Sequence, residues 1–250
     1  IGICKGCGVR YYLLGNGSNI LFADEGYDGA VIDLTALETG IEITGTELSA
    51  GAGVRLSALC KAALEQGLTG LEFAYGIPGT VGGAVYMNAG AYGGEMKDVL
   101  VRVRYLTAEG SIVEAAATEL DLRYRHSVFE ENGGCILSAH FALHPGQRDQ
   151  IRARMEELMA KRLDKQPLDK PSAGSTFKRP AGAFAAALID QCGLRGHRHG
   201  GAAVSDKHCG FVVNLGGASC ADVLALCEEV RTIVKEKTGY DLEKEIRVVR

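Results

Sequence analysis

The chain has 250 residues, of which 46% are hydrophobic and 23% are charged, and this globular composition excludes intrinsic disorder. No run of about 18 apolar residues occurs, which excludes a transmembrane helix, and the excess of 31 acidic over 27 basic residues argues against general nucleic-acid binding. Residues 1–10 lack a long apolar core and a cleavage motif, so we expect no signal peptide and a cytoplasmic location.

The first 145 residues show the patterns of short strands with few helices, which predicts an α+β domain. Apolar runs and alternation predict strands over 10–14, 29–34, 41–44, 46–50, 98–107, 111–115 and 135–143. Glu109 and Gly110 are suited to the turn of a hairpin between 98–107 and 111–115. Apolar residues at helical spacing predict a helix over 54–66, which Gly67 ends.

The pattern changes near Pro145, where longer helices begin. Helices are predicted over 147–163, 183–191 and 219–238, and short strands over 202–205, 211–214 and 242–249. Ser219 and Asp222 form the signature of a capping box at the start of the last helix, and Gly239 ends it. We therefore expect a first domain over 1–160, a second over 161–239 and a final strand over 240–250.

Charge is distributed unevenly along the chain. Residues 161–200 contain eight Lys or Arg and three Asp or Glu, a net charge of +5 within a chain whose net charge is −4. An anionic small molecule bound by this stretch and an ordinary solvated surface are both compatible with this distribution.

The residues that commonly bind metal do not form a complete motif. Cys4 and Cys7 make a single C-x-x-C pair, and no second pair has a matching spacing. His197 and His199 also lack an evident third ligand. We expect no metal site, and we expect the eight cysteines to be reduced thiols rather than a disulfide framework.

Two glycine clusters are candidates for binding an anionic ligand. The first, residues 15–19, follows a predicted strand and lacks both the third glycine of a dinucleotide-binding fingerprint and the Lys of a phosphate-binding loop. It is compatible with a turn or with a phosphate site. The second cluster has seven glycines within residues 76–94. This density favours bare backbone lying against an extended ligand such as a dinucleotide, although a purely structural loop is the alternative.

Six strings, in this order, resemble one enzyme family: LGNGSNIL, GLEFAYGIPGTVGGAVYMNAGAYGGE, YRHS, KQPLDKPSAGSTFKRP, SDKHCGFVVN and LEKEIRVV. The chain resembles the UDP-N-acetylenolpyruvoylglucosamine reductases from Tyr12 to Val249, in their shorter type II form. The resemblance implies a vanillyl-alcohol-oxidase-type FAD-binding domain over 1–160, whose first family strands would precede Ile1. It also implies a small α/β substrate-binding domain over 161–239 and a C-terminal strand that carries a catalytic glutamate.

The resemblance implies an NADPH-dependent flavoenzyme of peptidoglycan synthesis with non-covalent FAD. It would reduce the enolpyruvyl group of UDP-N-acetylglucosamine enolpyruvate to UDP-N-acetylmuramate, as a monomer that binds no nucleic acid or membrane. Two other functions stay open at this point. One is a different FAD oxidoreductase acting on a small alcohol or hydroxy acid, and the other is a non-catalytic nucleotide-sugar-binding module.

The resemblance also assigns site residues. It implies that Ser175 protonates the enol carbon and that Arg125 binds the substrate carboxylate. It also implies that Glu245, if protonated or paired, supports the charge that develops there, whereas an ordinary salt bridge of the strand is the alternative. The substrate positions implied by the family are Tyr124, Arg162, Gln166, Lys178 and Arg247. The cofactor positions are Gly15, Asn16, Gly17, Ser18, Asn19, Gly76, Ile77, Pro78, Gly79, Thr80, Gly82, Gly83, Ala84, Asn88 and Gly90.

Overall fold

The computed structural model describes residues 1–37 and 40–250, which form two compact units. Unit 1 contains Ile1–Asn16 and Gly29–Arg162, and unit 2 contains Gly17–Asp28 and Leu163–Arg250. The chain therefore passes from unit 1 into unit 2 at the first glycine cluster and returns at Gly29. The predicted domain ranges, being contiguous, do not contain this early exchange.

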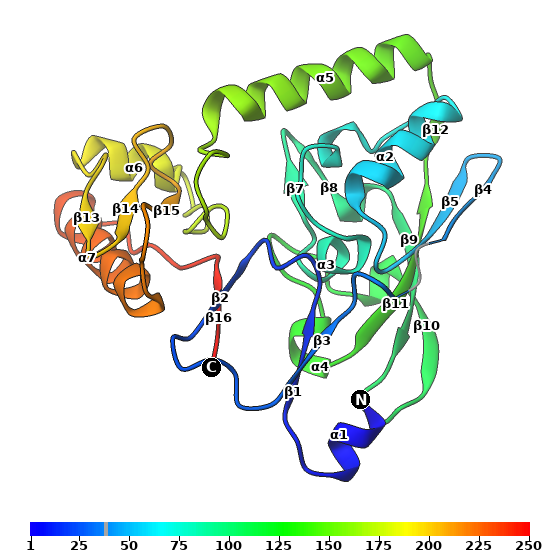
Figure 1. Cartoon of the computed structure of the whole chain (residues 1–250). Helices are drawn as coiled ribbons and strands as arrows, with labels where there is room; N and C mark the ends of the chain where they lie inside the picture. Colours follow the sequence, from blue (N-terminus) through cyan, green and yellow to red (C-terminus); the bar gives the residue numbers. More distant parts are fainter. Residues whose placement is uncertain (38–39) are drawn as a thin grey trace. The chain divides into compact units, whose positions relative to one another are not determined.

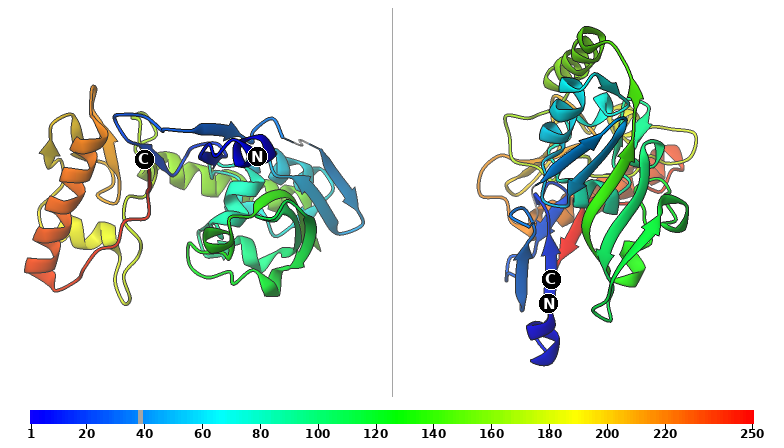
Figure 2. Two further views of the ribbon diagram at one scale, coloured as in Figure 1. Left: turned by 90° about the horizontal axis from the view of Figure 1, so that it is seen from below. Right: turned by 90° about the vertical axis from the view of Figure 1, so that its right-hand side faces the viewer.

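Unit 1 is built on an antiparallel five-stranded sheet in the order β10-β9-β11-β5-β4. Its strands are β4 (Ile41–Thr44), β5 (Glu47–Gly51), β9 (Leu100–Leu106), β10 (Ile112–Ala116) and β11 (Cys135–Ala142). The strands β9, β10 and β11 run side by side in Figures 1 and 2. The predicted hairpin is confirmed, because Ile112 lies opposite Leu106 in the β9–β10 ladder.

The core of unit 1 lies between this sheet and two helices, α2 (Leu56–Glu65) and α3 (Val81–Tyr86). Phe141 of the sheet, Leu59 of α2 and Val85 of α3 are fully buried in one apolar cluster. Residues 81–86 were not predicted as a helix, because the glycines at its start weaken helix propensity. Tertiary packing of Val81, Ala84 and Val85 stabilises the helix in spite of those glycines.

Smaller elements complete unit 1. They are α1 (Gly2–Gly6), β1 (Tyr11–Leu14), β3 (Ala30–Asp33), β6 (Leu68–Thr69), η1 (Glu72–Ala74), β7 (Gly90–Ala91), β8 (Gly94–Glu95), η2 (Met96–Asp98), η3 (Ala117–Glu119), α4 (Phe129–Asn132), β12 (His144–Pro145) and the start of α5 (Arg148–Lys165). Strand β1 pairs with β3 in parallel, and β1 leads directly into the first glycine cluster. The predicted helix over 147–163 is confirmed as α5, which buries Ile151 and Met155 in the unit 1 core.

Unit 2 surrounds its own apolar core, to which Ile189, Leu226 and Val230 belong. Its elements are β2 (Ile20–Phe22), α6 (Ala185–Gln191), β13 (Arg198–His199), β14 (Ala202–Val204), β15 (Val212–Asn214), α7 (Cys220–Thr238) and β16 (Arg247–Val249). The predicted capping box is present at the start of α7, and Gly239 ends that helix with a φ of 79°. Together the two units confirm the expected α+β class.

The final strand is shorter than predicted. The sequence predicts a strand over 242–249, whereas only Arg247–Val249 form a regular strand, paired in parallel with β2. Residues before it turn their apolar side chains, Leu242 and Ile246, into the unit 2 core. The residues of this segment alternate as in a strand, but they pair with the segment after Gly174 through a single bridge, Phe177 with Lys244.

No helix among the described residues is long and apolar enough to cross a membrane.

Asp241 fixes the start of this C-terminal segment to α7. Its carboxylate accepts hydrogen bonds from Nε of Arg231 at 2.6 Å and from Nζ of Lys235 at 2.8 Å, and these lower the pKa of Asp241 to about 2. A carboxyl whose folded-state pKa is depressed stabilises the protein above its unfolded pKa, and loses that contribution as the pH falls through the folded pKa. The sensitive window therefore lies between the ordinary value of 3.8 and about 2.

We expect Asp241→Asn to lower the melting temperature at pH 6 by a few degrees, because ion pairs at exposed positions are screened by solvent. The difference from the unmodified protein should shrink as the pH is lowered from 4 toward 2. Thermal melts at several pH values test this expectation, with Asp169→Asn as the control at an exposed position without an ion pair among the described residues. A difference that persists unchanged at pH 2 would contradict it.

Candidate active site

The first glycine cluster presents unoccupied backbone donors. Among the described residues, the amides of Gly15, Asn16, Gly17 and Ser18 have no hydrogen-bond acceptor within the chain. Gly17 has a φ of 66°, a backbone conformation that glycine adopts without strain. Successive amides that face no internal acceptor can bind the oxygens of an anion such as a diphosphate. The loop thus has backbone donors of the kind that a phosphate site requires.

The first and second glycine clusters lie against each other. Nδ2 of Asn16 donates to the carbonyl of Pro78 at 2.7 Å. A Cβ at Gly15 would lie 3.0 Å from Oγ1 of Thr80, so a larger residue would crowd the second cluster. These contacts bring the predicted cofactor residues Gly15 and Asn16 next to Pro78 and Thr80.

The second cluster offers fewer backbone donors than its glycine content indicates. The amides of Gly79, Val81 and Gly82 donate to the carbonyls of Ile77, Val54 and Ala52. Several of its glycines are also needed for packing, which supports the alternative of a structural loop for part of this cluster. A Cβ would lie 2.9 Å from Ala52 at Gly82, 2.7 Å from the Gly94 carbonyl at Gly90, and 2.7 Å from Phe73 at Gly94.

Two glycines of this cluster do keep bare backbone accessible. A Cβ at Gly79 would make only an ordinary contact of 3.7 Å, with Leu56, and one at Gly83 a contact of 3.5 Å, with Thr80. Among the predicted cofactor positions, Asn88 differs most from expectation. It is fully buried, and its side chain bonds to Glu95, Lys97 and Arg123, so no side-chain donor remains for a cofactor.

Arg125 occupies a strained position in the loop between η3 and α4. Its φ is 54°, a left-handed conformation that costs free energy for a residue with a long side chain. Nη2 of Arg125 donates to the Gly90 carbonyl at 3.0 Å, and the guanidinium lies 5.0 Å from the ring centre of Tyr124. Such strain persists only where the surrounding structure enforces it, which is typical of functional sites.

Arg162, near the end of α5, is a half-buried cation without a carboxylate partner among the residues that the structure describes. Its Cδ would contact a Cβ placed at Gly76 at 3.0 Å, so the side chain lies along the second glycine cluster. Burial lowers the pKa of the Arg162 guanidinium, and nearby Tyr92 opposes that shift. Because burial removes part of the water around the guanidinium, binding an anion stabilises its charge.

Ser175 and Glu245 belong to neighbouring segments of unit 2. Ser175 forms a bridge with Phe211, while the next residue, Thr176, accepts a 2.8 Å hydrogen bond at its carbonyl from the Glu245 amide. Thr176 is 1% exposed, and its hydroxyl accepts a hydrogen bond from the Val212 amide at 2.8 Å. These contacts join the segments that contain Ser175, Phe211 and Glu245, and they fix the backbone that carries the two candidate catalytic side chains.

Asn19 attaches the end of the first glycine cluster to the backbone of the segment that contains Glu245. Its Nδ2 donates to the Glu245 carbonyl at 3.2 Å, and its own carbonyl accepts from the Arg247 amide at 2.9 Å. The sequence assigns Asn19 to cofactor binding, and the structure adds a contact with the backbone of Glu245. No feature of the sequence alone predicts this contact, because it joins residues 226 positions apart.

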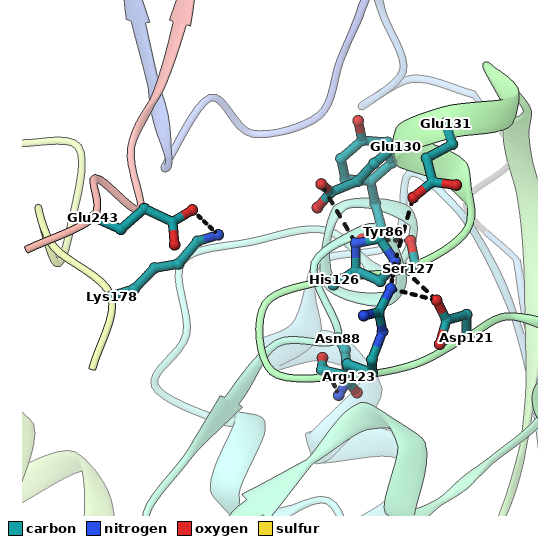
Figure 3. A network of polar contacts seen from close by, with 10 residues as sticks. All are labelled: Tyr86, Asn88, Asp121, Arg123, His126, Ser127, Glu130, Glu131, Lys178 and Glu243. Carbon is teal, nitrogen blue, oxygen red and sulfur yellow. Dashed lines mark hydrogen bonds and ion pairs between the residues drawn. The ribbon is translucent and has the colours of Figure 1, made fainter. Parts of the chain in front are cut away.

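The remaining predicted substrate residues differ in how their polar groups are used. Nζ of Lys178 already pairs with Oε1 of Glu243 at 2.5 Å, as Figure 3 shows. Oε1 of Gln166 is buried and lacks a hydrogen-bond partner within the described part of the chain. A buried acceptor without a partner is costly, which makes Gln166 a candidate for contact with a ligand. Arg247 begins β16.

The histidine pair has an internal partner. His197 and His199 bond to the two carboxylate oxygens of Glu229, at 2.9 Å and 2.7 Å. No group of three or more His, Cys, Asp or Glu side chains within residues 1–37 and 40–250 has a geometry that could bind a metal ion. All eight cysteines are free thiols.

The sequence is similar to one family of known proteins. Residues 166–249 match the family described as UDP-N-acetylenolpyruvoylglucosamine reductase, C-terminal domain, and residues 1–116 match an FAD binding domain. UDP-N-acetylenolpyruvoylglucosamine reductases from Agathobacter rectalis and Clostridium novyi are each 49% identical to it. These matches cover 100% of this chain and 83% and 81% of the relatives. The crystal structure of UDP-N-acetylenolpyruvylglucosamine reductase from Thermus caldophilus has a TM-score of 0.85 at 37% identity, covering 99% of this chain and 88% of that one.

Proposed function

Because the chain belongs to the UDP-N-acetylenolpyruvoylglucosamine reductase family, we propose how its own residues carry out that family's reaction. The protein is an FAD-dependent oxidoreductase of peptidoglycan synthesis that uses NADPH. Its substrate is UDP-N-acetylglucosamine enolpyruvate, and its product is UDP-N-acetylmuramate. The observation that carries the residue assignment is the pairing of the Ser175 and Glu245 segments through the Thr176 carbonyl.

The backbone donors of the first glycine cluster fit a diphosphate of FAD. The amides of Gly15 to Ser18 have no internal acceptor among the described residues. In unit 1, a Cβ at Gly79 or Gly83 would make only ordinary contacts. In this proposal the first cluster binds the diphosphate through its amides. The second cluster mainly supplies glycine backbone, without side chains, against which the cofactor can pack. FAD held there would supply the hydride chemistry of the reaction, with NADPH as the source and the terminal vinyl carbon of the substrate as the acceptor.

The chain's own residues then handle the charge and the proton. As hydride arrives, negative charge develops on the carbon next to the substrate carboxylate and on the carboxylate itself. Arg125 binds that carboxylate, and Glu245, in its protonated or paired form, supports the charge that develops on it. Ser175 donates its hydroxyl proton to the carbon. A serine hydroxyl is a weak acid, so its transfer depends on positive charge nearby after the proton has left.

Measuring NADPH oxidation by the FAD-loaded protein tests this function. We expect oxidation to require the enolpyruvyl nucleotide sugar and to consume one equivalent of it for each NADPH. Turnover that depends on oxygen and a small alcohol would instead favour another oxidoreductase of this fold. Protein that binds the nucleotide sugar without binding flavin would favour a non-catalytic binding module.

We also propose that Arg162 binds the diphosphate of the nucleotide sugar, and that Gln166 and Lys178 are substrate-binding residues of unit 2. Arg162→Ala should raise KM for the nucleotide sugar more than it lowers kcat, because the diphosphate contacts are similar in the ground state and the transition state. Affinity should also weaken as salt concentration rises. Steady-state kinetics at two salt concentrations measure both effects, with the exposed Arg152→Ala on the same helix as the control. An unchanged KM in Arg162→Ala would contradict the assignment.

The location and the oligomeric state belong to the proposal as well. Both NADPH and UDP-sugars are soluble nucleotides, so we propose that the reaction takes place in the cytoplasm. We propose a monomer, and light scattering coupled to size-exclusion chromatography measures its mass directly.

A further inference from the structure

Three residues of one segment hold the loop that carries Arg125. Residues 86, 88 and 90, in and just after α3, contact residues 127, 123 and 125 of the loop in turn. Oγ of Ser127 donates to the Tyr86 carbonyl at 2.6 Å, and Nδ2 of Asn88 donates to the Arg123 carbonyl at 3.0 Å. The third contact is from Arg125 to the Gly90 carbonyl. Figure 3 shows Asn88 with Arg123 and Ser127 with Tyr86.

The two anchors of this contact are completely buried. Asn88 and Ser127 are both 0% exposed, so no water competes for their hydrogen bonds. Asn88 has a φ of 40°, and its side chain uses both kinds of polar atom. Nδ2 donates to Oε2 of Glu95 at 2.7 Å as well as to Arg123, and Oδ1 accepts from the Lys97 amide at 2.9 Å. Asn88 thereby joins the turn at 95–97 to the Arg125 loop.

A surface cluster holds the same loop from outside. Oδ2 of Asp121 accepts from Nη2 of Arg123 at 2.5 Å and lies 3.2 Å from Nε2 of His126. Arg123 lowers the pKa of the Asp121 carboxyl, with a smaller contribution from His126. These groups are more exposed than Asn88 and Ser127, so we expect them to contribute less to the conformation of Arg125.

We infer that Asn88 is a positioning residue for Arg125 and not a ligand of the cofactor. Its three side-chain hydrogen bonds all go to protein groups, and one of them fixes the backbone two residues before Arg125. The strained φ of Arg125 requires such support, since an unsupported loop would relax to a more favourable conformation. Asn88 thus fixes the direction in which the guanidinium meets the substrate carboxylate. This inference rests on the role proposed above for Arg125.

The test uses Asn88→Gly in the full-length, FAD-loaded protein. Glycine keeps access to positive φ and removes only the side-chain contacts. We expect NADPH to reduce the flavin at an unchanged rate and FAD affinity to stay the same. Reoxidation of the flavin by the enolpyruvyl substrate should slow about 10–100-fold, the effect of misplacing a binding group. Ile151→Ala, which creates a cavity in the same core away from the loop, controls for general loss of stability.

A double-mutant cycle separates positioning from other roles. In an Arg125→Asn background, Asn88→Gly should change the reoxidation rate by less than about twofold, because its effect passes through Arg125. A full additional loss in that background would overturn the inference. Weakened FAD binding by Asn88→Gly alone would overturn it too and would return Asn88 to the cofactor ligands.

A second pair of variants covers the case in which Asn88→Gly does not fold. Ser127→Ala removes the hydrogen bond to Tyr86 and should slow reoxidation in the same selective way, whereas Ser127→Thr keeps the hydroxyl and should retain more of the rate. Equal rates in the two Ser127 variants and the unmodified protein would overturn the inference. If the unmodified protein itself shows no reoxidation by the enolpyruvyl substrate, the proposed function fails instead, so the two failures are distinguishable.

Discussion

Ser175→Ala is expected to separate the two halves of the reaction. In the proposed mechanism, Ser175 protonates the carbon beside the carboxylate and takes no part in moving hydride from NADPH to FAD. NADPH should therefore bleach the flavin of the variant at a nearly normal rate. Reoxidation by the enolpyruvyl substrate should slow by about 10²–10⁴-fold, the usual contribution of a positioned acid. Stopped-flow absorbance of each half-reaction measures the two rates independently.

The structure makes this substitution a clean one. Ser175 follows Gly174 in the segment that bridges to Phe211, and its backbone contacts do not depend on the hydroxyl. Folding should therefore change little, which a thermal melt confirms or refutes. Ser175→Cys should recover part of the rate, because a thiol is a stronger acid than a hydroxyl. Equal loss in both half-reactions, or loss only in flavin reduction, would show that Ser175 has a cofactor-binding or structural role.

Regular elements with strong local patterns were predictable from the sequence. Helix α7 has a capping box, a periodic apolar face and a terminal glycine, and each of these signals is local. Helix α3 and strand β2 were missed, because glycine-rich or very short segments are stabilised by packing that no local pattern reveals. The same limit explains why Gly17–Asp28 could not be assigned to unit 2 in advance.

The candidate site was predictable as a set of residues but less so as a set of roles. The family strings lead to Ser175, Glu245 and Arg125, yet strings give no information on which polar atoms are already satisfied. Asn88 belongs to a cofactor string, and only its buried contacts with Glu95, Lys97 and Arg123 show that its amide is occupied. Distinguishing a ligand from a support requires the three-dimensional hydrogen-bond partners.

Arg125→Asn is expected to cause the second large loss. Arg125 is the cation of unit 1 that we assign to the carboxylate on which charge develops, so its removal should slow reoxidation by about 10²–10³-fold. Asparagine is chosen because it tolerates the positive φ of 54° better than most residues, so the substitution removes charge with little added backbone strain. The rate of flavin reduction by NADPH should be unchanged.

Arg125→Lys provides the matched control, since it keeps the charge and loses the planar pair of donors. If bidentate binding of the carboxylate matters, lysine should restore only part of the rate, because a single ammonium cannot reproduce the two parallel hydrogen bonds. Adding guanidinium chloride to Arg125→Asn should then raise the reoxidation rate, as a free cation occupies the vacated position. Full activity of the lysine variant would show that charge alone suffices. Normal reoxidation in Arg125→Asn would show that another cation binds the carboxylate, and Arg247 of unit 2 would be the next residue to replace.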